Sequence, residues 1–328
     1  MKTREFGTSG ITGSAVGFGL WTVSTGWWGD VTDDQAVALI REAFDLGITV
    51  YDTADTYGEG RGERLLAKAL GDKRDQITIA TKFGYDIYSP WERKGHVERP
   101  HDWTPDFIRF ALEQSLQRLE TDHIDLYQLH NPRLDALQSD TVFEVLEEAK
   151  AAGKIRGYGA ALGPAIGWRD EGVWALRNRR MAVLQIIHNM LEQDPGRELL
   201  EMAHTADAGV LVRVPHSSGM LEGKYTRDTV FAENDHRRHR SQEWLEEGLR
   251  KIERLEFLTD GRTLGQAAIQ WLLADPLVTS VLPNIYTSEQ LQEFAAAPDT
   301  PELTAEELAQ VADLYANDFY LSTAGAGA

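Results

Sequence analysis

Short runs rich in Val, Ile and Leu alternate along the chain with longer segments in which apolar residues recur every three or four positions. The short runs have the length of strands, and the spacing in the longer segments buries one face of a helix. Eight short runs can be counted, at residues 14–20, 47–52, 76–82, 123–130, 155–161, 181–188, 209–214 and 277–283. The helical segments between them include 32–47, 104–120, 140–153, 196–209 and 263–276.

Two of the helical segments begin with threonine and acidic residues. Thr32 precedes Asp33, and Thr104 precedes Pro105 and Asp106. Threonine is a common N-cap residue, so we expect both threonines to cap their helices. The second segment has an apolar face made of Ile108, Leu112, Ser115 or Leu116, and Leu119.

Strand followed by helix, eight times over, predicts an α/β fold of the (β/α)8 TIM-barrel type in a single domain spanning residues 1–328. A doubly wound sheet is the main competitor, but "GFGLWTV" (17–23) carries only the first two glycines of the G-x-G-x-x-G turn that such sheets use. Residues 4–14 predict a short N-terminal β-hairpin over the barrel floor. The tail 322–328 is expected to fray.

Composition narrows the classes of function. The chain has no cysteine, which excludes thiolate nucleophiles and cysteine-ligated metals, and no metal site is predicted. A net charge of −19 disfavours binding to nucleic acid or an anionic membrane, with "HRRHR" (236–240) the only basic cluster. No apolar run approaches the roughly 20 residues of a membrane helix. We therefore expect a cytoplasmic protein without nucleic-acid or membrane partners, whose oligomeric state stays open.

Polar residues close three successive predicted strands, where a barrel of this type builds its active site. Asp52 and Lys82 end the second and third strands, His130 ends the fourth, and Tyr57 follows Asp52 by five residues. An ammonium near a tyrosine favours the phenolate, so Lys82 is expected to lower the pKa of Tyr57 and Asp52 to hold Lys82. With His130 orienting a carbonyl, Tyr57 would be the proton donor, and a nicotinamide cofactor would have to supply hydride.

At this point the sequence resembles the aldo-keto reductase family along almost its whole length. The similarity is carried by "YDTADTYGEGRGE" (51–63), "ATKFG" (80–84), "DLYQLHNP" (125–132), "GKIRGYG" (153–159), "LEGKY" (221–225) and "EQLQEF" (289–294). The resemblance implies a barrel that binds NADP(H) across its mouth and reduces aldehydes or ketones. It carries over Asp52, Tyr57, Lys82 and His130 as the catalytic residues.

The resemblance also implies where the cofactor lies. The implied cofactor-binding residues are Gly19, Trp21, Gln185, His188, Arg213, Pro215, His216, Ser217, Gly219, Leu221, Lys224, Pro283, Asn284, Tyr286, Gln290 and Glu293. Among them, Gln185 would hold the nicotinamide carboxamide, and His188 replaces a tyrosine that stacks on the ring in many members.

Several family positions have changed. The Ser-Asn pair that usually holds the carboxamide is Ala161 and Leu162, and the asparagine expected after Glu293 is Phe294. Basic residues that would bind a 2′-phosphate are missing from 283–290, unless Arg213 or the 236–240 cluster reaches it. NADP(H) is thus implied by resemblance, and NAD(H) remains open.

Aromatic residues beside the predicted mouth indicate the substrate. Trp21, Trp27 and Trp28 lie in the first loop, and Tyr85 and Trp91 follow the third strand. Such walls suit sugar and aryl carbonyls, and Arg93 and Lys94 could attract an anionic substrate. The predicted function is an NAD(P)-dependent carbonyl reductase or alcohol dehydrogenase acting on a small-molecule carbonyl. The alternatives are a non-redox epimerase, dehydratase or lyase, or a binding or regulatory subunit.

Overall fold

The computed structural model describes residues 1–92, 98–163, 168–233 and 235–321, with the side chain of His236 left out. Eight parallel strands form one sheet in sequential order from β3 to β10. A parallel bridge between Val16, just before β3, and Val281 of β10 brings the two edges together. The predicted (β/α)8 barrel is confirmed. The expectations for Arg93, Lys94 and the tail 322–328 fall outside the described residues.

The strands match the eight apolar runs of the sequence, because each run supplies side chains for both faces of a buried strand. The barrel strands are β3 (Phe18–Gly19), β4 (Val50–Asp52), β5 (Thr78–Phe83), β6 (Ile124–His130), β7 (Ile155–Ala161), β8 (Val183–Ile187), β9 (Gly209–Arg213) and β10 (Val278–Leu282). The hairpin strands are β1 (Thr3–Glu5) and β2 (Thr12–Ser14), which pair antiparallel.

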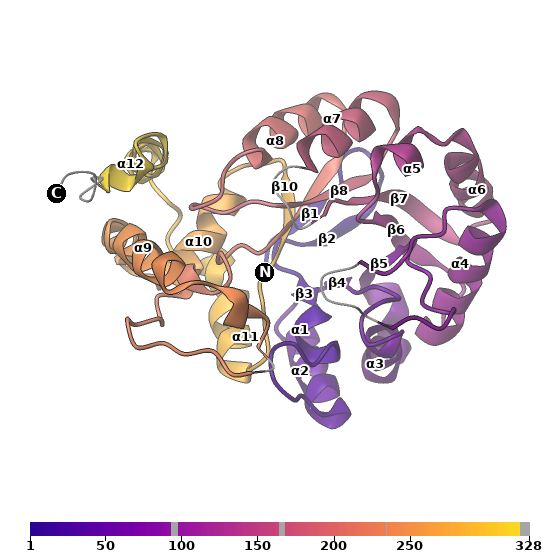
Figure 1. The fold of residues 1–328 in the computed structure, drawn as a ribbon, viewed down its shortest axis with the longest axis horizontal. Coiled ribbons are helices and arrows are strands. Elements are labelled where there is room, and N and C mark those ends of the chain that lie inside the picture. The colour runs from indigo at the N-terminus through magenta and orange to yellow at the C-terminus, as the bar shows by residue number, and fades with distance from the viewer. Residues whose placement is uncertain (93–97, 164–167, 234, 322–328) are drawn as a thin grey trace.

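Helices lie outside the strands around the barrel, with α9 and α12 projecting to one side (Figure 1). The α-helices are α1 (Trp21–Ser24), α2 (Asp33–Asp45), α3 (Arg61–Leu70), α4 (Pro105–Leu119), α5 (Leu134–Gln138), α6 (Asp140–Ala151), α7 (Arg169–Asn178), α8 (Gly196–Thr205), α9 (Gln242–Glu253), α10 (Leu264–Leu273), α11 (Ser288–Ala295) and α12 (Ala305–Ala316). The 3-10 helices are η1 (Gly71–Gln76), η3 (Met220–Glu222), η4 (His236–His239), η5 (Glu256–Thr259), η6 (Ala297–Asp299) and η7 (Asp318–Tyr320).

The two predicted threonine caps have different outcomes. Thr32 caps α2 in a reciprocal capping box with Gln35. Thr104 precedes α4, but its hydroxyl donates to Asp102 Oδ1 at 2.7 Å and makes no cap bond to the helix. The prediction for Thr104 was wrong because the upstream carboxylate competes for the hydroxyl. The predicted apolar face of α4 is buried as expected.

The barrel interior is built in two layers. The lower layer is apolar and comprises Phe6, Ile11, Val50, Ala80, Leu126, Val183, Leu211 and Leu282. Side chains alternate along a strand, so the residue two positions further along faces the same interior. Those residues on β4, β5, β6, β8 and β9 are Asp52, Lys82, Gln128, Gln185 and Arg213. An apolar floor therefore supports a polar layer at the carboxyl ends of the strands.

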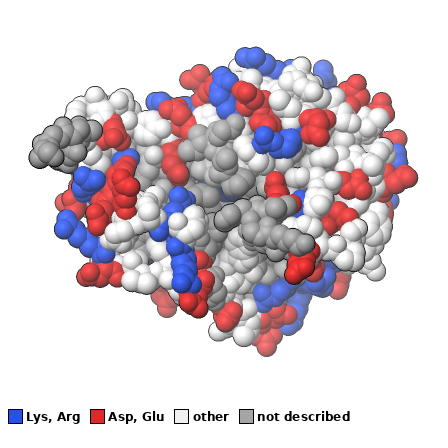
Figure 2. Space-filling view, in the orientation of Figure 1, with Lys and Arg blue, Asp and Glu red and all other residues white. Residues whose placement is uncertain are grey.

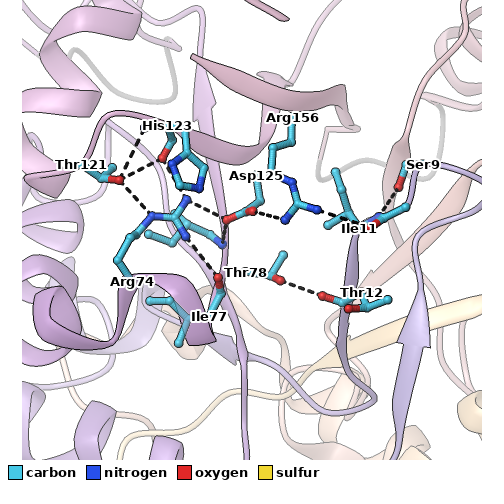
Figure 3. Close-up of polar contacts among 12 residues, drawn as sticks. Ser9, Ile11, Thr12, Arg74, Ile77, Thr78, Thr121, His123, Asp125 and Arg156 are labelled. Atoms are coloured by element: carbon cyan, nitrogen blue, oxygen red, sulfur yellow. Dashed lines mark hydrogen bonds and ion pairs between the residues drawn. The ribbon is translucent and has the colours of Figure 1, made fainter. Parts of the chain in front are cut away.

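The N-terminal hairpin closes the bottom of the barrel, as predicted. Thr78 Oγ1 donates to the carbonyl of Thr12 at 2.7 Å, and Arg156 donates to the carbonyl of Gly10 at 3.3 Å. Asp125, at the start of β6, accepts hydrogen bonds of 2.8 Å from both Arg74 and Arg156 (Figure 3). Asp125 and the two arginines are thus paired with one another in the barrel floor. This network is structural and lies at the opposite end of the barrel from the mouth.

Acidic and basic side chains are interspersed over the face of the molecule that Figure 2 shows. Within the part of the chain that the structure describes, no helix is long and apolar enough to cross a membrane.

Candidate active site

Lys82 connects the predicted catalytic residues. From β5 its Nζ donates 2.7 Å to Asp52 Oδ2 at the end of β4, and 2.8 Å to the carbonyl of Thr53. The same Nζ lies 3.2 Å from the hydroxyl of Tyr57, which is in the loop between β4 and α3. Lys82 is 1% exposed, so its charge depends on these three oxygens.

The second oxygen of Asp52 is held by two glutamines. Gln185 Nε2 donates to Asp52 Oδ1 at 2.8 Å, and Gln128 Nε2 lies 3.3 Å from the same oxygen. Sequence analysis missed Gln128, although it stands two residues before His130 on β6 and so faces the same interior. The carboxylate is thus fixed from β5, β6 and β8 at once.

Burial and charge act in opposite directions on the two reactive groups. Burial lowers the pKa of Lys82, but the neighbouring Asp52 and Tyr57 outweigh it and the pKa is raised. Burial raises the pKa of Tyr57, and the nearby Lys82 offsets this only in part. The expectation that Lys82 lowers the pKa of Tyr57 below its ordinary value was wrong, because desolvation of the phenolate is the larger effect. Tyr57 therefore holds its proton throughout the neutral range.

His130, the last residue of β6, is a neutral imidazole at the mouth. Burial first, and then the charges of Lys82 and Arg213, put its pKa well below the ordinary value. Its Nδ1 lies 3.4 Å from Thr56 Oγ1, and its ring stands edge-on to Tyr57 with centroids 6.0 Å apart. A neutral histidine in this position can donate a hydrogen bond to a substrate oxygen without competing for the proton.

The guanidinium of Arg213 occupies the region where the Ser-Asn pair was expected. Its Nη2 donates to the carbonyl of Leu162 at 2.8 Å, so the side chain reaches from β9 past β8 to the end of β7. Ala161 pairs with Gln185 and His130 in the sheet. Arg213 was predicted to reach a 2′-phosphate if it moved, but it lies at the catalytic end.

Two predicted nicotinamide contacts are arranged differently from the expectation. The amide nitrogen of Gln185 is committed to Asp52. The His188 ring contacts Trp271 of α10 at a centroid distance of 5.0 Å and is buried, which lowers its pKa to about 4. β8 ends at Ile187, and alternation from Gln185 directs Ile187 toward the mouth and His188 toward the helices. His188 therefore packs behind the sheet.

The other end of the predicted cofactor site lies between the segment after β9 and α11. His216 Nε2 donates a hydrogen bond of 3.0 Å to the carbonyl of Gly265, and the His216 ring packs on Phe294 with the ring centroids 4.4 Å apart. Lys224 Nζ bonds Glu293 Oε2 at 3.1 Å. The remaining predicted residues follow the same edge: Gly19 ends β3, Pro215, Ser217 and Gly219 precede η3, Leu221 lies in it, Pro283 and Asn284 follow β10, and Gln290 lies in α11.

The predicted aromatic residues of the first loop form a connected group. Trp21 lies 6.0 Å from Trp27 and 5.8 Å from Trp28, and Trp28 lies 5.9 Å from Tyr286. This group joins the first loop to the segment after β10. Trp27 is exposed and Trp28 is buried, so only part of the group can meet a ligand from solvent.

The predicted substrate residues after β5 have other partners. Tyr85 stands edge-on to His130 at 5.0 Å, stacks on His101 at 4.0 Å and accepts a hydrogen bond from Asn131 Nδ2 at 2.7 Å. Tyr85 therefore packs against His130, the predicted catalytic histidine, and helps to fix its ring. Trp91 lies under the guanidinium of Arg99 at 5.1 Å.

The basic cluster 236–240 is used within the protein. Arg237 forms two hydrogen bonds to Asp235, of 2.9 and 2.6 Å, and donates to the hydroxyl of Tyr225 at 2.8 Å. Its guanidinium also lies 4.3 Å from the ring of Trp28. The cluster thus attaches the segment after β9 to the first loop. Nowhere in the described residues do three His, Asp or Glu side chains gather to hold a metal ion.

Comparison with known proteins agrees with this geometry. The model of the aldo/keto reductase family matches residues 15–316. The chain is 30% identical over 292 residues to the aldo-keto reductase YhdN of Bacillus subtilis, covering 84% of this chain and 82% of that one. It is 32% identical over 317 residues to the NADH-specific methylglyoxal reductase of Escherichia coli, covering 90% and 93%.

A solved structure has the same architecture. The glycerol dehydrogenase AKR11B4 from Gluconobacter oxydans superimposes with a TM-score of 0.82 over 99% of both chains, at 28% identity. The family match, these relatives and the Asp52, Tyr57, Lys82 and His130 arrangement lead to one conclusion: the chain belongs to the aldo/keto reductase family.

Proposed function

We propose that this protein reduces a small aldehyde or ketone, with hydride from a nicotinamide cofactor and a proton from Tyr57. The observation that carries the proposal is the position of Lys82 Nζ, which lies 2.7 Å from Asp52 Oδ2 and 3.2 Å from the Tyr57 hydroxyl. A carbonyl oxygen that becomes an alkoxide needs a nearby proton donor whose conjugate base is stabilised. The cytoplasm is its proposed location.

Each residue of the site has a separate task in this proposal. Tyr57 gives its phenolic proton to the substrate oxygen, and the ammonium of Lys82 stabilises the phenolate that remains. Asp52 keeps Lys82 charged and in place. His130, neutral at physiological pH, donates a hydrogen bond that orients the substrate oxygen toward Tyr57. The cofactor, when bound, supplies the hydride that reduces the carbonyl carbon.

The residues at the mouth fit a nicotinamide, although not through the usual pair. Ala161 offers only a methyl group, and the side-chain nitrogen of Gln185 is committed to Asp52. Arg213 uses one N–H for the Leu162 carbonyl, and a guanidinium carries five. We propose that its remaining N–H groups hold the carboxamide oxygen. The resemblance implies NADP(H) as cofactor, and the NADH-specific relative makes NAD(H) an equal candidate.

The substrate proposal is a small carbonyl compound. Methylglyoxal is the first compound to test, because the name of one relative gives it as that relative's substrate. Larger aryl and sugar aldehydes should be tested next, because the aromatic group of the first loop favours ligands with flat apolar faces.

The proposal is tested by replacing Tyr57 with Phe. Reductase activity should fall by at least about a thousandfold, since general acid catalysis and its positioning are both lost, while cofactor affinity should stay within about twofold. Tyr158→Phe is the matched control, because the Tyr158 hydroxyl bonds Glu147 outside the barrel. Retained turnover in Tyr57→Phe would reject the assignment, and absent binding of both cofactors would favour a non-redox enzyme or a binding subunit.

A further inference from the structure

Glu222 is a buried carboxylate that the proposed chemistry does not use. It ends η3 and is 9% exposed. Its Oε2 accepts a hydrogen bond of 3.0 Å from Gln290 Nε2. Its Oε1 is buried, and no hydrogen-bond donor reaches it within the described residues. A carboxylate oxygen withdrawn from water without a donor is costly, so this oxygen marks a place for a hydrogen-bond donor from a ligand.

The surroundings of Glu222 belong to the far end of the proposed cofactor site. Gln290 also accepts the backbone N–H of Tyr286 at 3.3 Å, and the Tyr286 ring lies 5.9 Å from that of Trp28. Glu222 therefore lies where the segment after β9 meets α11, at the end of the predicted cofactor site that is away from Tyr57, and we assign the adenosine half of the dinucleotide to this end. The inference rests on the proposed function.

The charges around Glu222 are unfavourable for a phosphate. The two cations that act on it are Lys224 and Arg237. Lys224 pairs with Glu293 at 3.1 Å, and Arg237 pairs with Asp235 at 2.6 Å. Glu222 has no cation of its own, so two cations stand among three carboxylates. A dianionic 2′-phosphate placed here would meet net negative charge in a partly desolvated site.

We propose that Glu222 selects an unphosphorylated dinucleotide, NAD(H), by accepting a hydrogen bond from a hydroxyl of the adenosine ribose and repelling a 2′-phosphate. A carboxylate paired with the ribose 2′-hydroxyl is the chemistry by which NAD is chosen over NADP at other dinucleotide sites. The ribose hydroxyl gives Oε1 the donor that the protein does not provide. Gln290 keeps the carboxylate in place through the other oxygen.

The experiment measures binding, so it does not depend on turnover. Purified full-length protein is titrated with NADH, NADPH, ADP-ribose and 2′-phospho-ADP-ribose, with quenching of tryptophan fluorescence as the readout. The unphosphorylated ligand of each pair should bind at least about tenfold tighter. In Glu222→Gln, which keeps the shape and removes the charge, the preference should shrink by about tenfold or more, through weaker NADH and stronger NADPH binding. Glu222→Ser is a second variant, with a smaller side chain, in which the preference for the unphosphorylated ligand should shrink in the same way.

Glu243→Gln is the matched control, because Glu243 is exposed in α9 and its loss changes the net charge equally. An unchanged preference in that variant shows that the effect is local to Glu222. Equal or tighter binding of NADPH by the unmodified protein would overturn the inference alone, as would an unchanged preference in both Glu222 variants. Absence of binding by all four ligands would overturn the proposed function, and this inference with it.

Discussion

Arg213 Nη2 lies 2.8 Å from the carbonyl oxygen of Leu162, and this bond brings a guanidinium from β9 to the end of β7. The neighbouring side chain on β7, Ala161, cannot form a hydrogen bond. The guanidinium also adds a positive charge at this end of the barrel, where it acts on Tyr57 together with Lys82. Ala161 and Leu162 therefore lack the hydrogen-bonding side chains expected at these positions, and Arg213 of β9 places a donor group beside them.

Replacing Arg213 with Met is expected to weaken binding of the nicotinamide half of the cofactor. A hydrogen bond from a charged donor contributes about 1.5–3 kcal/mol, so NADH affinity should fall by about 10- to 100-fold. ADP-ribose, which lacks the nicotinamide, should bind as before. Fluorescence titration checks both ligands, with Arg180→Met as a control on an exposed arginine. If the affinities for NADH and ADP-ribose fell equally, Arg213 would not act through the nicotinamide half of the cofactor.

The raised pKa of Tyr57 determines how activity depends on pH. Because burial lifts this pKa above its ordinary value, the phenol stays protonated until the pH exceeds that value. Carbonyl reduction, which needs the phenol, should be flat from about pH 6 to 9. Alcohol oxidation needs the phenolate and should rise about tenfold for each pH unit.

The two pH profiles must be measured on the chemical step, under single-turnover conditions. His130 has a pKa well below its ordinary value, so its protonation adds no acid limb near neutrality. A reduction rate that declined between about pH 6 and 8 would mean that the proton donor is another group, since Tyr57 cannot lose its proton there.

The fold and the meeting of the candidate catalytic side chains at the barrel mouth were predictable because both follow from local patterns. The apolar runs and the helical spacing predicted the barrel. The rule that active sites form where the barrel strands end singled out Asp52, Lys82 and His130. Alternation along β6 would also have identified Gln128. The same rule, applied from Gln185, would have placed Ile187 at the mouth and His188 behind the sheet.

Other features depend on packing that no local pattern carries. The direction of the Tyr57 pKa comes from a balance between burial and Lys82, and burial is known only once the loops are in place. Glu222 is one glutamate among many in the sequence, and its importance appears only when η3 packs against α11. Threonine is a suitable residue for a helix cap, but the hydroxyl of Thr104 donates its hydrogen bond to Asp102.

Replacing Asp52 with Asn is expected to destabilise the protein as well as inactivate it. Lys82 would keep a buried ammonium without its carboxylate, and breaking one side of a buried pair costs about 3–5 kcal/mol. Urea unfolding at pH 7 measures this loss. Asp34→Asn is the control, because its ion pair with Lys68 is exposed, and little change in stability is expected there.

A second replacement tests the cause of that loss. Adding Lys82→Met to Asp52→Asn removes the uncompensated charge, so part of the stability should return although activity stays absent. A double variant that is less stable than Asp52→Asn by the full cost of a lost Lys82 would show that the two residues act independently.

Two buried histidines are expected to make the protein sensitive to acid. His188 packs on Trp271 and His216 on Phe294, and burial lowers the pKa of each to about 4. An unfolded histidine has a pKa of about 6.5, so the unfolded chain binds more protons whenever the pH lies below that value. Their contribution is complete above about pH 6.5 and is lost as the pH falls toward 4, by about 1.4 kcal/mol per pH unit for each histidine.

Replacing His188 with Gln removes one of these two titrations. The variant will be less stable at every pH because it loses the packing of the imidazole ring. The informative quantity is therefore the slope of the unfolding free energy against pH, measured between pH 6 and 5. That slope should be shallower than in the unmodified protein by about 1 kcal/mol per pH unit, since one fewer proton is taken up on unfolding. His204→Asn, an exposed position in α8, should keep the original slope. Identical slopes in His188→Gln and the unmodified protein would mean that His188 already binds its proton in the folded state, against its burial.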